Sequence, residues 1–217
     1  MKKMILPLFA LAALASCQEE KKPAEAPVVA AANTENKTEA PAPAKAMPDQ
    51  ATMEKNWKDY MTPGTEHGLL AEAKGDWVGE MKMWQAPGAP PDSSTIQQEN
   101  RMLLGGRYQQ SIAKGNVMTM PFEGISTVGF DNHKKKYVST WIDNMGTGVM
   151  NMEGSWDATT KTINFTGKMI NPATKAEEDV RETFTILDKD HHLMTMYGTG
   201  PDGKEFKTMQ IHYTRKK

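Results

Sequence analysis

The segment from Tyr137 to Asp143 holds the side chains whose types and spacing best suit a binding site. Alternate residues of a β-strand face the same way, so Tyr137, Ser139, Trp141 and Asp143 share one face. Trp141 offers a large apolar surface with one polar atom, and Asp143 offers a carboxylate. We expect Trp141 to face the interior of its domain and Asp143 to lie near the mouth of that interior.

Two further side chains are expected to complete this site. Arg107 can hold a carboxylate or phosphate through two parallel hydrogen bonds, and we expect Asp143 to orient Arg107 when no ligand is bound. Tyr197 would add apolar contact with a polar handle. The predicted ligand-binding residues are therefore Arg107, Trp141, Asp143 and Tyr197. They would suit a small, largely apolar ligand that can carry an anionic group, whereas a satisfied ion pair of Asp143 with an arginine is the structural alternative.

Methionine is frequent in this chain, which contains 17 of them. Four pairs stand two positions apart, namely Met81/Met83, Met118/Met120, Met150/Met152 and Met194/Met196. Thioethers close to His191 and His192 are ligands that Cu(I) accepts, so a copper carrier is one alternative function. Methionine also fills irregular apolar interiors, and pairs on separate strands need not converge. We favour the packing interpretation and predict no metal site.

The sequence contains no signature of a known reaction. There is no G-x-S-x-G elbow, no phosphate-binding loop and no dinucleotide fingerprint, and the 5 histidines lack the spacing of a zinc site. We therefore predict no catalytic residue. An uncharacterised enzyme stays a further alternative, and nothing in the sequence points to a particular cofactor or oligomeric state.

From residue 74 onward, short turns divide the chain into ten strand-like segments. The expected strands are Trp77–Trp84, Thr95–Met102, Arg107–Ala113, Phe122–Phe130, Tyr137–Ile142, Val149–Trp156, Thr162–Ile170, Val180–Leu187, Leu193–Tyr197 and Glu205–Thr214. A meander of antiparallel strands leaves two unpaired edges unless the sheet closes. We predict an all-β domain over residues 74–217, a single antiparallel up-and-down barrel with an interior cavity. An open sheet or a sandwich is the competing architecture.

The N-terminus resembles the signal peptide of a bacterial lipoprotein. A basic start is followed by an apolar run from Met4 to Ala15, which is too short to span a bilayer. Leu14-Ala15-Ser16-Cys17 matches a lipobox, and the resemblance implies cleavage after residue 16 and acylation of Cys17. An ordinary secretory peptide is the alternative. We expect the protein to be anchored in a bacterial envelope membrane through lipidated Cys17, and in the outer membrane because no Asp follows Cys17.

Two segments are expected between Cys17 and the barrel. Residues 17–48 have almost no large apolar side chains and cannot offset their ordering entropy, so we predict a disordered tether. In residues 49–73, Met53, Trp57 and Tyr60 recur at helical spacing, and Pro63 interrupts the pattern. We expect one or two helices there, which either cover the barrel as a lid or pack on its outside.

The charge balance argues against nucleic acid as a partner. Without residues 1–16 the chain would carry 24 basic and 27 acidic residues, and it has no basic stripe with interleaved aromatic side chains.

Six short motifs together resemble a bacterial family known only as a domain of unknown function. They are Gly75–Glu80, Leu104–Tyr108 (LGGRY), Pro121–Gly124 (PFEG), Gly129–Asn132 (GFDN), Tyr137–Asp143 (YVSTWID) and Gly203–Phe206. The resemblance implies a barrel similar in shape to lipocalins and fatty-acid-binding proteins, and it implies no reaction. A module that binds a small apolar ligand in its barrel is the function we predict. A structural or interaction lipoprotein with a filled core is the first alternative.

Overall fold

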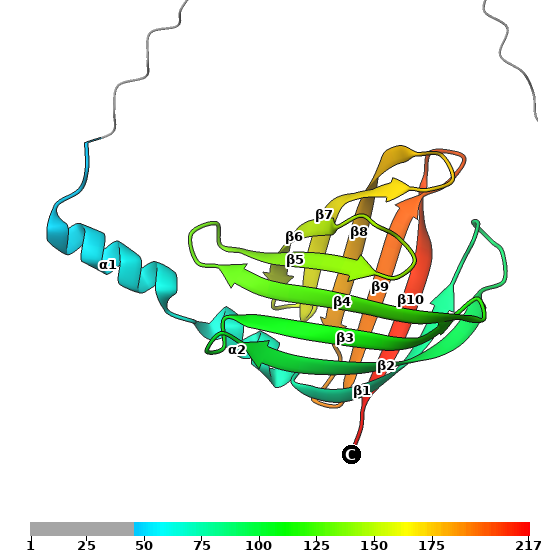
Figure 1. The fold of residues 1–217 in the computed structure, drawn as a ribbon, viewed down its shortest axis with the longest axis horizontal. Helices are drawn as coiled ribbons and strands as arrows, with labels where there is room; N and C mark the ends of the chain where they lie inside the picture. Colours follow the sequence, from blue (N-terminus) through cyan, green and yellow to red (C-terminus); the bar gives the residue numbers. More distant parts are fainter. Residues whose placement is uncertain (1–45) are drawn as a thin grey trace, which may run out of the picture. The chain divides into compact units, whose positions relative to one another are not determined.

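The computed structural model describes residues 46–217, and the expectations for residues 1–45, including Cys17, lie outside this part of the chain. Two helices precede ten strands (Figure 1). The helices are α1 (Gln50–Met61) and α2 (Thr65–Glu72). The strands are β1 (Gly75–Met83), β2 (Asp92–Leu103), β3 (Tyr108–Val117), β4 (Met120–Asp131), β5 (Lys136–Asp143), β6 (Met150–Asp157), β7 (Thr162–Asn171), β8 (Ala176–Ile186), β9 (His191–Thr199) and β10 (Glu205–Arg215).

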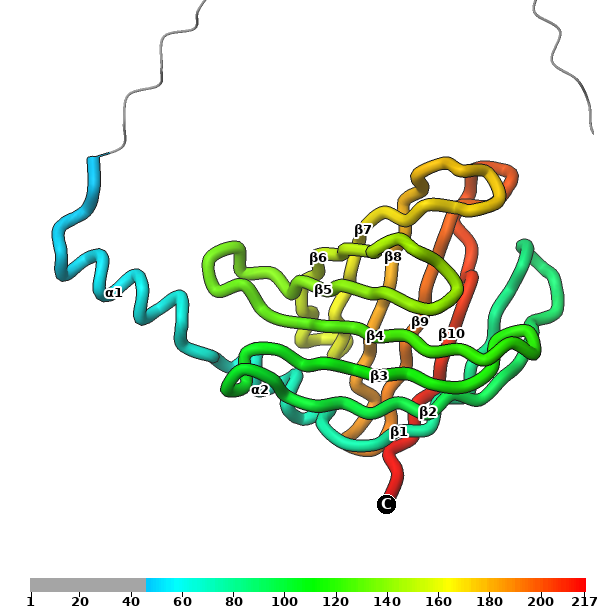
Figure 2. The backbone as a smooth tube through the Cα atoms, viewed as in Figure 1, coloured from blue at the N-terminus to red at the C-terminus, as the bar shows by residue number. Residues whose placement is uncertain are grey.

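Every strand pairs with its neighbours in sequence, and β1 pairs with β10 to close the barrel. The closing register runs from Trp77 opposite Arg215 to Met83 opposite Met209, and Figure 2 traces the whole meander. Closure leaves no unpaired sheet edge among these strands, which removes the sites where another chain could add a strand. The predicted all-β, antiparallel up-and-down barrel with a short N-terminal helical segment is confirmed.

Some strands are longer than their sequence patterns suggested. β2 begins at Asp92 rather than Thr95, and β8 begins at Ala176 rather than Val180. Except for Ala176, the added residues are polar, and all lie at strand ends, where main-chain pairing extends the ladder although hydrophobic alternation has already stopped. Glu177, for example, pairs across the ladder with Ile170 and forms an ion pair with Lys168.

The two helices relate to the barrel in different ways. α1 is capped by Asp49, whose Oδ1 accepts a hydrogen bond from the Thr52 amide at 2.8 Å, and it buries none of its residues. α2 buries His67 and Leu70, and Leu70 belongs to an apolar cluster of the barrel interior. Neither helix of residues 46–217 has the length and apolar character needed to cross a membrane.

Candidate functional site

The middle of the barrel is open on the inside. The strand register places one set of side chains on the inner face, and many of them near the middle are only half-buried. They are Ser126 and Val128 on β4, Ser139 and Trp141 on β5, Glu182 and Phe184 on β8, and Met194 and Met196 on β9. An inward-facing side chain in a closed barrel can keep accessible surface only if it borders an internal space. We call this space the lumen.

The lumen lies between two separate apolar clusters. One cluster is built around Trp77, Ile96 and Ile211, and the other around Leu70, Tyr137 and Phe165. The lumen is lined by half-buried side chains that pack against these clusters. They are Trp141 and Met194 at the first cluster and Val128 and Met196 at the second. The walls are therefore mostly apolar.

Helix α2 seals one end of the barrel. Interior side chains hold its main chain: Gln109 Nε2 donates to the Leu70 carbonyl at 2.5 Å, and Asn100 Nδ2 and Trp77 Nε1 both donate to the Ala73 carbonyl at 2.9 Å. These bonds add side-chain donors to carbonyls at the C-terminal end of α2, where the helix itself supplies too few amides. Arg215 adds a bond from Nη2 to the Glu72 carbonyl at 2.8 Å.

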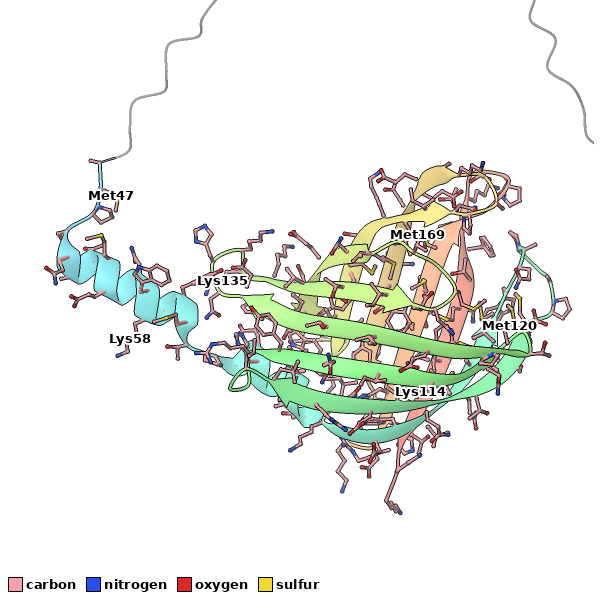
Figure 3. The ribbon with its side chains drawn as sticks, in the orientation of Figure 1. Met47, Lys58, Lys114, Met120, Lys135 and Met169 are labelled. Atoms are coloured by element: carbon pink, nitrogen blue, oxygen red, sulfur yellow. The ribbon has the colours of Figure 1, made fainter. Side chains whose placement is uncertain are left out.

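The opposite end is open. A hollow of ≈ 680 Å³ lies there beside the β3–β4 turn, lined in part by the inward-facing Met83, Ser94 and Val117. The turns and strand ends here carry exposed apolar side chains, namely Met118, Met120, Met145, Val149, Met169 and Ile170. Figure 3 labels Met120 on this rim, at the far end of the barrel from Lys135 beside α1.

Trp141 and Asp143 lie together on the inner face near this open end, as predicted. Trp141 Nε1 donates to Asp143 Oδ2 at 2.7 Å, and Asp143 Oδ1 accepts from the Met145 amide at 2.9 Å. The indole lies over Gly124, where a Cβ atom would stand 2.3 Å from Trp141 Cζ2. Phe122 stacks against it, with ring centroids 6.2 Å apart. The glycine of the PFEG motif therefore makes room for the tryptophan of the next strand.

Arg107 does not join this pair, which corrects the expectation that Asp143 would orient it. Arg107 lies in the β2–β3 turn, at the end of the barrel that α2 seals, whereas Asp143 lies at the other end. Its Nη1 donates to the Leu104 carbonyl at 3.0 Å and its Nη2 to the Met61 carbonyl at 2.6 Å. Asn132 in the β4–β5 turn binds the same helix end, with Nδ2 donating to the Thr62 carbonyl at 2.8 Å. The LGGRY and GFDN motifs thus fix the junction of α1 and α2.

Tyr197 also lies outside the lumen. Inward-facing residues of β9 alternate with it, so its ring is on the outer face of the barrel. The Arg181 guanidinium lies 3.8 Å from the ring centroid, and Arg181 Nη2 pairs with Glu205 Oε1 at 2.7 Å. Only Trp141 and Asp143 of the predicted set face the lumen, because strand parity decides the side and sequence alone left the parity of Tyr197 open.

Glu182 is a lumen residue that the predicted set lacks. It occupies the inner face of β8 opposite Phe165 on β7 and Met196 on β9. Burial among apolar neighbours raises the pKa of Glu182 to about 7. A signal was present in the sequence, because Glu182 stands at two-residue spacing in line with Val180, Phe184 and Ile186, which makes it an acid among apolar residues of one strand face.

His192 is buried close to the sealed end. Its ring stacks on Trp77 at a centroid distance of 4.2 Å and meets Phe184 edge-on at 5.1 Å. Desolvation, helped by the positive charge of Arg215, lowers the pKa of His192 to about 4. The ring is therefore neutral at physiological pH.

The methionine pairs do not gather into one metal site. Met81 belongs to the first apolar cluster and Met152 to the second, and the exposed His191 ring is hydrogen-bonded through Nδ1 to Asp188 at 2.9 Å. No group of three His, Cys, Asp or Glu side chains arranged for a metal ion occurs within residues 46–217.

A second hollow of ≈ 770 Å³ lies over the outer wall of the barrel. Its lining includes the outward-facing Thr140, Asn151, Lys168 and Asp179 of strands β5 to β8. These side chains are polar or charged, and Lys168 already pairs with Asp179 at 3.4 Å. The same hollow also borders the apolar Val138 and Val149, but it lies on an open surface among charged side chains. The lumen is enclosed by the barrel, so it is the better candidate site for an apolar ligand.

Comparison with known proteins gives a family and a fold. The model of a family described as "Protein of unknown function (DUF1579)" matches residues 62–215, and no curated protein matches the chain. Rv2717c from M. tuberculosis has a similar structure, with a TM-score of 0.55 and 11% identity over 72% of this chain and 100% of that chain. The S-type phycobiliprotein lyase CPES from Guillardia theta gives a TM-score of 0.48 and 8% identity, covering 78% of this chain and 99% of that one.

Proposed function

This chain belongs to the family of proteins of unknown function DUF1579, and we propose that its barrel binds a small, largely apolar ligand in the lumen. One observation carries this proposal: inward-facing side chains in the middle of the barrel keep accessible surface while α2 covers one end. A core that served only for packing would bury these side chains, because protein interiors are normally close-packed.

The chemistry of the walls supports an apolar ligand. Trp141, Phe184, Met194 and Met196 present aromatic and thioether surfaces to the lumen, and methionine adapts its shape to different ligands. The exposed apolar side chains around the open end would give the apolar part of such a ligand a surface to contact as it enters.

An anionic group on the ligand is no longer part of this proposal. That idea depended on Arg107, which binds main-chain carbonyls at the sealed end. The inward-facing charged side chains nearest the lumen, Asp143 and Glu182, are acidic.

The test compares two substitutions on neighbouring residues of β4. Ser126→Phe would project a ring into the lumen, whereas Thr127→Phe would project the same ring outward. Native mass spectrometry of gently purified wild type should detect a bound small molecule, which Ser126→Phe should lack and Thr127→Phe should retain.

Thermal melting separates a hollow barrel from a filled one. If the lumen is hollow, Ser126→Phe should melt close to the wild-type temperature, because the ring enters open space. A loss of about 1–3 kcal/mol or more, as expected for overpacking of a filled core, would contradict the proposal. An absence of any ligand, together with that loss, would favour the structural alternative.

We further propose that the barrel is held at a bacterial envelope membrane through lipidated Cys17. The support is the lipobox-like sequence Leu14-Ala15-Ser16-Cys17. The following stretch of polar, proline-rich chain would let the barrel reach tens of ångströms from the lipid, where it could exchange apolar molecules with the membrane.

A further inference from the structure

The charges that face the lumen are of one sign. Four acidic residues share the inward-facing register, Asp92, Asp143 and Glu178 at the open rim and Glu182 deeper inside. Of the basic residues in the ten described strands, only Arg215 has inward register, and it lies at the sealed end. Its guanidinium donates there to the carbonyls of Glu72 and Lys74, at and just after the end of α2, and to the Lys189 carbonyl in the β8–β9 turn.

Glu182 differs from two of the other inward-facing carboxylates, Asp143 and Glu178. Asp143 accepts hydrogen bonds from Trp141 and Met145, and Glu178 accepts one from Asn171 Nδ2 at 2.8 Å. Among residues 46–217, no side chain or amide donates to Glu182, and no ion pair includes it. A carboxyl group in apolar surroundings without a donor is costly unless a partner arrives.

The carboxyl group of Glu182 must border the lumen. Every fully buried side-chain nitrogen or oxygen in the described part of the chain has a hydrogen-bond partner. The Glu182 oxygens have no such partner, so they are not fully buried. Because the strand register puts Glu182 on the inner face, the space that they contact is the lumen. The Tyr213 hydroxyl is in the same position, because its ring is buried and no partner for it is found among these residues.

Tyr213 lies on the inner face of β10, opposite His192 on β9. Burial raises the pKa of Tyr213, and the negative charge of Glu182 raises it further. The other ionisable groups around Glu182 supply no counter-charge. The inner face of β7 offers Ile163, Phe165 and Met169, and His192 on β9 is neutral.

We propose that Glu182 is a polar anchor that selects an apolar ligand carrying a protonated amine. This inference rests on the proposed function of the lumen and names the class of molecule that it would take. An ammonium group would give the carboxylate the ion pair that the protein does not provide, while the apolar tail would contact Trp141, Met194 and Met196. A carboxylate ligand would meet an acidic lumen with no free basic side chain near the anchor.

The test uses three probes that share one chain length and differ in head group: dodecylamine, dodecanol and dodecanoate. Each is titrated into the protein by isothermal calorimetry, at physiological ionic strength to suppress binding to surface charge. Wild type should bind dodecylammonium about tenfold or more tightly than dodecanol, since hydrogen bonds to charged groups are the strong ones. Dodecanoate should bind most weakly.

Glu182→Gln keeps the size of the side chain and removes its charge. In this variant dodecylammonium should lose about tenfold or more in affinity, and dodecanol should change by no more than about threefold. Glu178→Gln is the matched control on the same strand and face, and it should leave the preference for the amine intact. A cooperative melt establishes that each variant is folded.

The outcomes distinguish this inference from the function on which it rests. If wild type binds dodecylammonium and dodecanol equally, or if Glu182→Gln keeps the wild-type preference, the lumen binds apolar molecules but Glu182 is not the anchor. If wild type binds none of the three probes, both the inference and the proposed lumen function are overturned.

Discussion

Trp141 and Asp143 are two residues apart on β5, and the indole Nε1 donates to the Asp143 carboxylate at 2.7 Å. The carboxylate therefore holds the ring of a neighbour in its own strand rather than a distant arginine. Gly124 on β4 leaves the space into which the ring is held. The Trp141 ring thus forms an aromatic wall at the open end of the lumen. Its orientation is fixed by the hydrogen bond to Asp143 and by the space that Gly124 leaves on the neighbouring strand.

We predict that Asp143→Ala weakens ligand binding, because Trp141 loses the acceptor that orients it. The variant should also lose about 1 kcal/mol of stability, since the Nε1 donor of a half-buried ring is left unpaired. Asp143→Asn is the control, because its amide oxygen can still accept from Trp141. Calorimetric titration with dodecanol and a denaturant melt measure the two effects, and equal losses in both variants would show that charge rather than ring orientation matters.

Gly124→Ala should destabilise the barrel. Its new methyl group would stand 2.3 Å from the Trp141 ring, so the ring or the strand must move. The expected cost is about 1–3 kcal/mol, the usual range for overpacking. Gly146→Ala serves as the control, since a Cβ there meets nothing within 4 Å, and it should change stability by less than about 0.5 kcal/mol. Urea unfolding of both variants decides the point, and similar midpoints would contradict the close packing of Trp141 on Gly124.

Leu70→Ala should be far more costly than Trp57→Ala, although tryptophan is the larger side chain. Leu70 is 6% exposed and fills the sealed end of the barrel, whereas Trp57 on α1 is 63% exposed. Loss of Leu70 should cost about 2–5 kcal/mol through the cavity it leaves, and loss of Trp57 about 0.5 kcal/mol or less. Thermal melts of the two variants give the comparison. A larger effect at Trp57 would mean that α1 packs against a surface of its own.

Glu182 and His192 should give the stability of the protein two opposing dependences on pH. The folded-state pKa of Glu182, about 7, lies above its ordinary value of 4.5. Between these two pH values the folded protein therefore keeps a proton that the unfolded chain has lost. Stability from this group therefore falls as the pH rises from about 4.5 to about 7, by at most about 3 kcal/mol. The folded-state pKa of His192, about 4, lies below its ordinary value of 6.5. Its contribution is present above pH 6.5 and is lost as the pH falls toward 4.

Glu182→Gln separates the two groups. Once the carboxyl group is removed, His192 is the only one of these two groups that still makes stability depend on pH. The stability of the variant should therefore rise with pH between about 4 and 6.5. Wild type should show a flatter or falling profile up to about pH 7, because the Glu182 dependence has the opposite sign. Chemical denaturation at a series of pH values measures both profiles. Parallel profiles for wild type and variant would contradict a raised Glu182 pKa.

The proposed membrane anchor predicts a change in location for Cys17→Ala. Wild type should take up labelled palmitate and sediment with the envelope membrane, because acyl chains add apolar surface that the bilayer buries. The variant should take up no label and appear in the soluble fraction. The idea fails if both proteins are unlabelled and equally soluble.

Much of this fold could be predicted from the sequence, because its signals are local. Turn residues between ten alternating segments indicated ten strands, and the cost of unpaired edges favoured closure. The break at Pro63 marked the end of the first helix, since the residue before a proline avoids helical conformation. The positions of Trp141 and Asp143 on one face followed from strand alternation alone.

The composition of the site was decided by the tertiary structure. Arg107 lies just before the start of the third strand and Asp143 at the end of the fifth, so the meander places them at opposite ends of the barrel. The predicted up-and-down order already implied this separation, and the expected pairing of Arg107 with Asp143 did not take it into account. Tyr197 and Met196 are adjacent, and only the closed register assigns one to the outer face and the other to the lumen. Glu182 was visible in the sequence as an acid between the apolar Val180 and Phe184 of one strand face, but its lack of a partner depends on the neighbouring strands. Alternation sets which residues share a face, whereas closure of the sheet sets which face is inside and what lies across it.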